Sequence, residues 1–180
     1  EVKNPSELFL QERGQNLVGS SVFASMEGSR PLLCEVQALT LSTQMANPRR
    51  TALGIDTNRL HMLSAVVDRH LNVKLAFQDI FINVVGGLRL IETASDLAVV
   101  ASLLSTSANR PLGRSSVYFG EIGLTGEIRG VPFADLRVKE AEKLGFKQYY
   151  IPAANKKHLK DIKLSSDSEI VYIKNIQDLR

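Results

Sequence analysis

A serine at the start of an apolar segment is a candidate nucleophile in this sequence. Ser95 lies in LIETASDLAVVASLLS, residues 90–105, close behind the acidic Glu92. A serine nucleophile needs a neighbouring group that removes its proton, commonly a histidine or a lysine kept neutral by burial. The simpler interpretation is that Ser95 caps the helix that follows it, which would stabilise the helix by about 1 kcal/mol.

Residues suited to metal or nucleotide chemistry are scattered. His61, His70 and His158 lack the HExxH spacing, and Cys34 is the single cysteine. No GxxxxGK[ST] motif is present, and the glycines of GEIGLTGEIRG separate two strand-like runs instead of opening a helix. We therefore expect that these 180 residues hold no metal, no nucleotide cofactor and no internal disulfide.

Basic side chains could supply a different chemistry, the binding of phosphates. The arginines that we assign to DNA contact lie in a proline-containing loop and on the helix after it: Arg49, Arg50, Arg59 and Arg69. Arginines bind the phosphate backbone without reading the base sequence. The alternative for this set is ordinary surface ion pairing, because Asp56 and Asp68 are close in sequence.

A denser basic group occurs later, at Lys156, Lys157, Lys160 and Lys163, and Asp161 interrupts it. This pattern favours a solvated helix face over a binding site. No aromatic residues alternate with these lysines, so the sequence predicts no stacking platform for single strands.

Hydrophobic periodicity and turn signals predict the elements that must position these residues. Helices are expected at 4–13 with Asn4 as cap, at 57–71 with Asp56 or Thr57 as cap, at 94–105, 132–146 and 155–163, and at the C-terminus. Strands are expected at 19–27 and 30–41 as a hairpin, at 80–87, twice within 115–131, at 148–152 and at 168–174, with a turn-rich segment at 43–56. The helix at 94–105 is apolar nearly all round, so it belongs inside the fold. Together these elements predict one α/β or α+β domain over residues 1–180.

Composition agrees with a single well-packed domain. The chain is 44% apolar and 23% charged, which excludes a disordered protein. Its net charge of +3 permits an acidic partner without requiring one. The apolar stretch at 97–104 is far shorter than the ~20 residues that cross a bilayer, and the first residues lack the pattern of a signal peptide. We expect a cytoplasmic protein that does not contact membranes.

The segment FGEIGLTGEIRGVPFADLRVKEAEKLGFKQYYIPAANKKHLKDI resembles the Lon peptidase domain, whose pattern is TGE…L.G.V.PVGGIKEKL.AA…G…..P..N…L. This resemblance implies a Lon-like fold of two small sheet-and-helix lobes with a ribosomal-protein-like second-domain topology. Laying GVPFADLRVKEA over PVGGIKEKLLAA places Asp135 at the catalytic lysine, and the nucleophile position falls on Ser95 or Ala94. An anion cannot replace a neutral lysine base, so the resemblance implies a peptidase fold without peptidase chemistry. An active Ser–Lys peptidase using Ser95 and Lys139 is the alternative.

Further segments resemble the C-terminal domain of the RadA (Sms) family of bacterial DNA repair proteins. They are NPSELFLQER, GSSVFASMEGSRPLLCEVQAL, NPRRTALGIDTNRLHMLSAVVDRH and DIFINVVGGLRLIETASDLA. The resemblance implies that a zinc-finger module and a RecA-like ATPase module lie upstream, so that Zn, ATP and Mg belong there and the full-length protein is a DNA-dependent ATPase or helicase. It also implies a homohexameric ring, DNA as ligand and a RecA-type recombinase as partner in recombination and branch migration. A pure oligomerisation domain without DNA contact is a further alternative. Ring size, the strand type of the DNA and the polarity of movement stay open.

Overall fold

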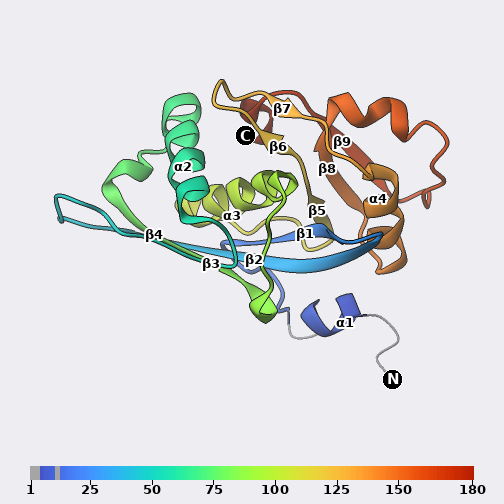
Figure 1. Ribbon diagram of the computed structural model, residues 1–180, viewed down its shortest axis with the longest axis horizontal. Helices are drawn as coiled ribbons and strands as arrows, with labels where there is room; N and C mark the ends of the chain where they lie inside the picture. The colour runs from blue at the N-terminus through green and yellow to red at the C-terminus, as the bar shows by residue number, and fades with distance from the viewer. Residues whose placement is uncertain (1–4, 11–12) are drawn as a thin grey trace.

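The computed structural model describes residues 5–10 and 13–180 (Figure 1). Helix α1, Pro5–Leu10, forms where the sequence predicts a helix, while its expected cap Asn4 lies outside the described residues. In the described part of the chain, no helix is long and apolar enough to cross a membrane.

One seven-stranded mixed sheet runs through the molecule, in the order β3-β4-β2-β1-β5-β8-β9. Its strands are β1 Ser20–Glu27, β2 Arg30–Ser42, β3 Arg50–Leu53, β4 Gln78–Val84, β5 Ser116–Tyr118, β8 Gln148–Pro152 and β9 Glu169–Ile173. β2 pairs antiparallel with β1 and β4, and the other neighbours are parallel. The α/β class is therefore confirmed. The expected division into two lobes is not how the strands pair, because β1 joins β5 and makes the sheet continuous.

Local turn chemistry accounts for the two hairpins. Gly28 adopts a positive φ of 63° between β1 and β2, a conformation that glycine adopts readily. A separate two-stranded sheet pairs β6, Glu121–Ile122, with β7, Ile128–Arg129, and Gly126 at φ 85° closes its turn. Both hairpins were expected from the glycine-punctuated sequence.

Helices α2, Thr57–Leu71, and α3, Asp96–Ala108, lie on one face of the sheet, and α4, Ala134–Lys143, packs on β1 and β2 (Figure 1). α3 is buried as predicted: Leu97 is 0% exposed, and residues all round the helix are covered. The α-helix begins at Asp96 instead of the expected residue 94, because a 3₁₀ turn, η3 Thr93–Ser95, precedes it.

Two segments differ from the sequence prediction. Strand β3 forms inside the segment expected to be turns, because pairing with β4 at the sheet edge overrides the weak strand preference of four residues. The basic segment expected as a helix at 155–163 instead forms the shorter 3₁₀ helix η4, Ala153–His158. Further 3₁₀ turns are η1 Leu75–Phe77, η2 Val85–Gly87 and the C-terminal η5 Ile176–Leu179.

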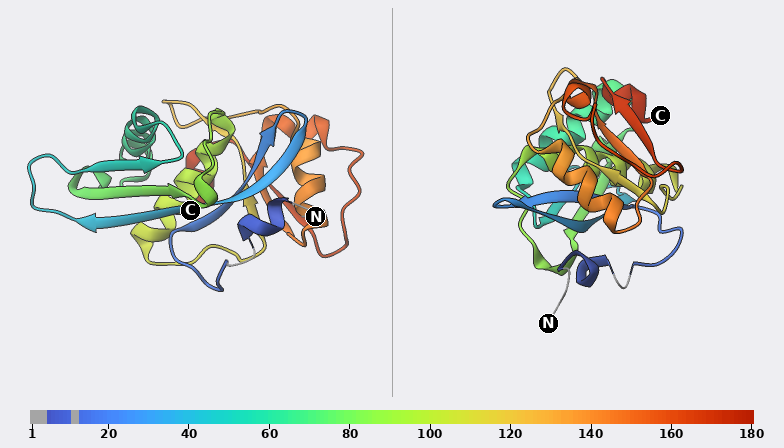
Figure 2. Two further views of the ribbon diagram at one scale, coloured as in Figure 1. Left: turned by 60° about the horizontal axis from the view of Figure 1, so that its bottom comes forward. Right: turned by 90° about the vertical axis from the view of Figure 1, so that its right-hand side faces the viewer.

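The opposite face of the sheet is only partly covered. α1 lies against β2 near one end, and no other helix of the described residues lies over β4 and β3 on this face (Figure 2, left). Leu39 and Leu41 on β2 are each 51% exposed there, and Leu53 on β3 is 63% exposed. Register places Leu39 opposite Phe81, so these side chains form an apolar surface that we call the open sheet face.

Candidate functional site

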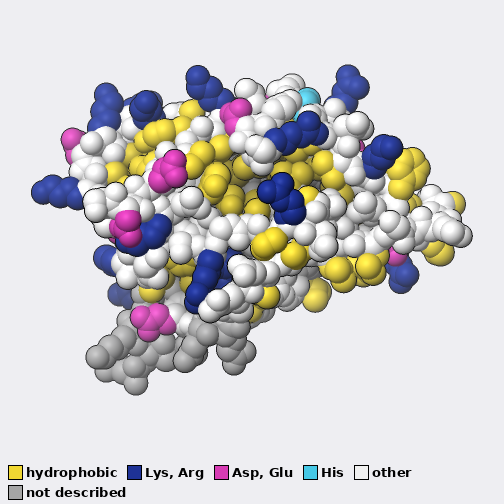
Figure 3. All heavy atoms as spheres, turned by 180° about the vertical axis from the view of Figure 1, so that it is seen from behind, with side chains coloured by type: hydrophobic (Ala, Val, Ile, Leu, Met, Phe, Trp, Pro, Cys, Tyr) yellow, Lys and Arg dark blue, Asp and Glu magenta, His cyan; other side chains and the backbone are white. Residues whose placement is uncertain are grey.

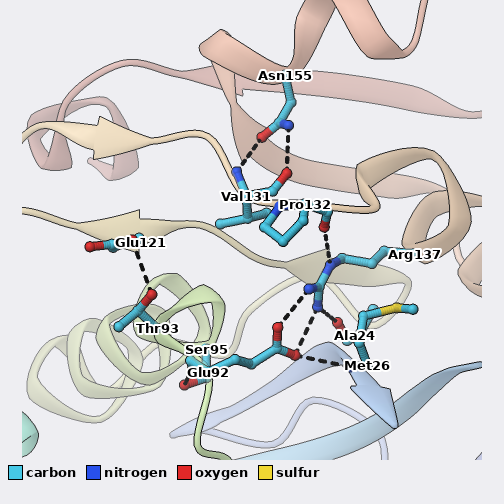
Figure 4. Close-up of polar contacts among 10 residues, drawn as sticks. All are labelled: Ala24, Met26, Glu92, Thr93, Ser95, Glu121, Val131, Pro132, Arg137 and Asn155. Carbon is cyan, nitrogen blue, oxygen red and sulfur yellow. Dashed lines mark hydrogen bonds and ion pairs between the residues drawn. The ribbon is translucent and has the colours of Figure 1, made fainter. Parts of the chain in front are cut away.

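Ser95 lies at the turn between η3 and α3 and is 5% exposed. Its hydroxyl donates a hydrogen bond to the backbone oxygen of Glu92, at 2.9 Å (Figure 4). The predicted capping role is wrong: Ser95 occupies the N-cap position, but its φ and ψ of −74° and −14° are already helical and its side chain accepts no helix N–H. A preceding 3₁₀ turn puts the serine inside the helical path, where capping geometry is lost.

Ala94, the other position assigned to the nucleophile, is buried and carries no reactive group. Its backbone oxygen accepts a hydrogen bond from Gly120 N at 2.8 Å, and Leu97 N donates to Gly120 O at 3.1 Å. These two bonds fix the turn at the start of α3 against the segment that follows β5.

Lys139 and Asp135 are on the solvent side of α4, with side chains 54% and 40% exposed. Their charged atoms are 3.2 Å apart in an i,i+4 pair. Such exposed pairs contribute only ~0.5 kcal/mol. The structure therefore does not bring Lys139 to Ser95, and Asp135 does not face the acids near the serine.

The inward side of α4 instead carries Arg137, which is 0% exposed. Its guanidinium donates to both carboxylate oxygens of Glu92, at 3.0 and 2.6 Å, to Pro132 O at 3.1 Å, and to Ala24 O (Figure 4). The rings of Phe23 and Phe119 each lie with centroids 5.7 Å from the guanidinium carbon.

This arginine was missed in the sequence, although a signal was present. Aligning the proline of PVGGIKEKL with Pro132 instead of Gly130 places Arg137 at the lysine position. A guanidinium stays protonated in proteins, so Arg137 can hold an anion but cannot remove a proton from Ser95.

A second ion pair lies close to the first. Arg59 donates from Nε to Asp96 Oδ1 at 2.9 Å, its Nη2 also contacts Asp96 Oδ2, and Nη2 donates to Ile122 O at 2.9 Å. Asp96 in turn accepts from Ile122 N at 3.0 Å. Burial raises the pKa of Asp96, and the hydrogen bond with Asp96 raises the pKa of Arg59. Arg59 thus ties α2 to α3 and β6.

The other arginines expected to bind DNA do not share one surface function. Arg50 donates to Leu75 O at 2.9 Å and Gln78 O at 2.6 Å, so it holds the η1–β4 backbone. Arg49 is 67% exposed at its side chain and lies 3.4 Å from Asp79. Arg69 is exposed on α2.

The acids expected to pair with these arginines have other roles. Asp56 caps α2 by accepting from Arg59 N at 2.8 Å. Asp68 accepts from Leu75 N and from Ala76 N, the latter at 2.8 Å. Ion pairing does occur in this region, but with Asp79 and Asp96.

A pocket of about 920 Å³ opens beside these pairs, between β3, the start of α2 and the segment that precedes α3. Glu92, Ser95, Asp96 and Arg59 line it, with the exposed Ile91 at its edge. In the described residues no group of three or more potential metal ligands gathers, and burial raises the pKa of the Cys34 thiol to about 12. Within this pocket the Ser95 hydroxyl donates to the backbone oxygen of Glu92, and that oxygen is not a base.

Residues 54–155, more than half of the chain, match the family model described as ChlI, subunit ChlI of Mg-chelatase, and the chain belongs to this family. The chain is also similar to proteins named DNA repair protein RadA. It is 49% identical to that of Rickettsia bellii over 173 residues, which is 91% of this chain and 39% of the relative. It is 52% identical to that of Pseudomonas aeruginosa and 50% identical to that of Escherichia coli, each over 155 residues, 86% of this chain and 34% of the relative. The chain thus spans less than two fifths of the length of these relatives.

Proposed function

We propose that this chain is a catalytically silent, Lon-peptidase-like domain of a RadA-type DNA repair protein. The observation that carries the proposal is the ion pair between the buried Arg137 and the partly buried Glu92, whose backbone oxygen accepts the Ser95 hydroxyl. It puts a permanent cation at the inward side of α4, where a peptidase of this kind would need a neutral lysine. The Ser95 hydroxyl donates its hydrogen bond to the backbone oxygen of Glu92, and that oxygen cannot act as a general base. Similarity to RadA proteins over most of the chain supports the repair context.

The domain's proposed part in the intact protein is to support a homohexameric ring and sequence-independent DNA binding. These activities would serve homologous recombination and branch migration in the cytoplasm, together with a RecA-type recombinase. We assign ATP, Mg and Zn to regions of the protein outside these residues. Of the predicted DNA contacts, Arg49 and Arg69 face solvent and could reach phosphates, while Arg50 and Arg59 would support the fold around them.

A protease assay on the intact protein tests the central claim. Casein and a fluorogenic peptide should not be cleaved above the background measured for the Ser95→Ala variant. Cleavage by the parent protein that disappears in Ser95→Ala would mean that the serine is a nucleophile after all and would overturn the proposal.

A pure assembly domain is the second candidate, and the open sheet face favours it. Exposed Leu39, Leu41 and Leu53 are the kind of contiguous apolar surface that protein interfaces bury. DNA binding distinguishes the two candidates, because an assembly domain would leave the affinity of the protein for DNA unchanged when surface cations of this chain are removed.

A further inference from the structure

The segment between η2 and α3, residues 88–92, is extended but belongs to neither sheet of the described residues, and we call it the edge segment. Its backbone angles are extended at both ends, with φ −66° and ψ 148° at the first residue and φ −86° and ψ 138° at the last. Leu90 faces inward, 6% exposed, and its N–H donates to Gly54 O at 2.7 Å, whereas Ile91 is 95% exposed. This alternation is that of a strand held against the fold on one side only.

The free side of the edge segment carries backbone groups without partners. In an extended chain the N–H and C=O groups of alternate residues point to opposite edges, so Arg89 and Ile91 direct theirs away from Gly54. In the described part of the chain, neither the N–H of Arg89 nor that of Ile91 has a hydrogen-bond acceptor. Unpaired groups along such an edge are a template for pairing with another extended chain.

The pocket of about 920 Å³ opens beside this edge, and the edge segment forms one of its walls. Apolar side chains from three further elements line it: Leu53 of β3, Met62 of α2 and Val99 of α3. Leu53 is 63% exposed and Met62 is 40% exposed, so part of this apolar lining is open to solvent. An apolar side chain of a bound chain would remove this surface from water, which favours binding.

Arg89 supplies a positive charge at the wall of the pocket. It is exposed, and it lies in no ion pair within the described residues. Basic side chains are spread over the molecule, as the view from behind shows (Figure 3), so charge alone does not single out a site. Arg89 differs because it stands beside unpaired backbone groups and an apolar pocket, where it favours a carboxylate on the bound chain. The other charged side chains of the lining already form ion pairs or a helix cap within the fold: Arg59, Asp96, Glu92 and Asp56.

We propose that the edge segment and the pocket bind an extended, acidic peptide segment of a partner protein. The peptide adds a strand along residues 89–91, places an apolar side chain in the pocket and sets a carboxylate against Arg89. In this mode of recognition the main-chain hydrogen bonds supply affinity and the side-chain pocket supplies specificity. The Ser95 hydroxyl in the same pocket donates to Glu92 O, so the peptide is held and not cut. The binding is independent of the proposed function, whereas the absence of cleavage rests on it.

Selection of random peptides displayed on phage, with the intact protein as bait, tests the site. The parent should enrich peptides in which Asp or Glu stands close to an apolar residue, and Ile91→Pro should not, because proline has no N–H to donate. Ile91→Ala keeps the N–H and is the matched control, which should select the same peptides as the parent. Equal enrichment by the parent and by Ile91→Pro would overturn the proposal.

Fluorescence anisotropy with one selected peptide tests the strand pairing without any change in the protein. N-methylation of single peptide amides should weaken binding by about ten-fold at alternate positions and leave it unchanged at the positions between them. The reason is that only every second N–H of an added strand faces the edge segment. Losses without this alternation would show that side chains alone hold the peptide and would overturn the strand addition.

Substitutions in the lining test the pocket and the charge with the same peptide. Met62→Lys should weaken binding by about ten-fold, because it puts a charge where the apolar side chain would lie. Arg89→Glu should weaken binding at low salt, and its difference from the parent should shrink as salt is raised. Leu41→Lys is the matched control on the open sheet face, where Leu41 is 51% exposed, and should bind like the parent. Parent-like binding by both Met62→Lys and Arg89→Glu would place the peptide elsewhere and overturn the proposal.

Failure of this inference is distinguishable from failure of the proposed function. If the parent cleaves the selected peptide and Ser95→Ala does not, the proposed function is wrong and the peptide site stands. If the parent enriches no peptide and cleaves none, only the peptide site is wrong. A smaller assembly of Ile91→Pro than of the parent in light scattering, with no peptide enriched by the parent, would assign the edge segment to a second copy of the chain and overturn the inference.

Discussion

Arg137 on α4 holds Glu92, in the segment before α3, by two N–H···O contacts of 3.0 and 2.6 Å. Glu92 also accepts from Met26 N at 2.9 Å, so the pair joins three elements that are far apart in sequence: β1, the turn into α3, and α4. These contacts link the start of α3 to β1 and to α4 through one carboxylate.

Removing the cation should therefore destabilise the protein. Arg137→Met keeps most of the volume but leaves Glu92 Oε2 and the oxygens of Ala24 and Pro132 without the guanidinium donor, while Met26 N still donates to Glu92 Oε1. The free energy of unfolding should fall by about 3 kcal/mol. Urea unfolding measures this loss, with Lys139→Met on the solvent side of α4 as a control that should change it by less than about 0.5 kcal/mol. Equal effects of the two variants would show that the Arg137–Glu92 pair contributes nothing to stability.

Burial of α3 predicts a strong effect of charge in its first turn. Leu97→Asp should lower the free energy of unfolding by several kcal/mol, because Leu97 is 0% exposed and the substitution would place a carboxylate in the core. Leu53→Asp is the matched control, since Leu53 is 63% exposed on the open sheet face. A melting temperature of Leu97→Asp equal to that of the control would mean that α3 is not in the core.

Asp135→Lys should not create peptidase activity. Position 135 is on the exposed side of α4, so a lysine there would lie in solvent and stay protonated, away from Ser95. The fluorogenic-peptide assay should show the same background as the parent. Turnover by this single variant would require that α4 present residue 135 to the serine, contrary to the structure.

The lowered pKa of Glu142 predicts that the stability of the protein depends on pH. Burial raises its pKa, but hydrogen bonds from Ser165 and Tyr149 outweigh this and lower the pKa from 4.5 to about 2. A lowered folded-state pKa stabilises the protein above the ordinary value, and this contribution is lost as pH falls from about 4.5 to about 2.

Glu142→Gln should accordingly melt several degrees below the parent at pH 7, and the difference should shrink toward zero as the pH approaches about 2. Melting curves across this range measure the difference. The control is Glu169→Gln, whose side chain is exposed and which should melt with the parent throughout. A difference between Glu142→Gln and the parent that is the same at both ends of the range would contradict the assigned pKa.

Elements with local signals could be predicted from the sequence. α2 begins after its cap Asp56, and β8 forms over Gln148–Pro152 as its β-branched and aromatic residues indicate. β3 could not be predicted, because its four residues are a strand only where β4 lies beside them. The sheet's continuity depends in the same way on a non-local contact, the pairing of β1 with β5.

The candidate site was predictable in its location but not in its contacts. Periodicity placed Ser95 at the start of a buried helix, which is correct. Which charged residue on α4 faces inward depends on how α4 packs, and the sequence alone does not reveal this. The sequence therefore points to Lys139 and Asp135, whereas in the structure Arg137 faces Glu92. Arg50 and Arg59 could not be recognised as internal, because their partners are backbone oxygens and an acid distant in sequence.

The parallel pairing of Val22 with Val117 has a consequence for the order in which the chain folds. During synthesis the β1–β2 hairpin can close as soon as β2 leaves the ribosome, but the second edge of β1 has no partner until β5 emerges, long afterwards. Val22, Phe23 and Ala24, all 0% exposed in the finished fold, therefore spend that interval on an unprotected strand. Non-local pairing of this kind slows folding and exposes the chain to aggregation. The nascent protein is most vulnerable between the completion of its first hairpin and the arrival of β5.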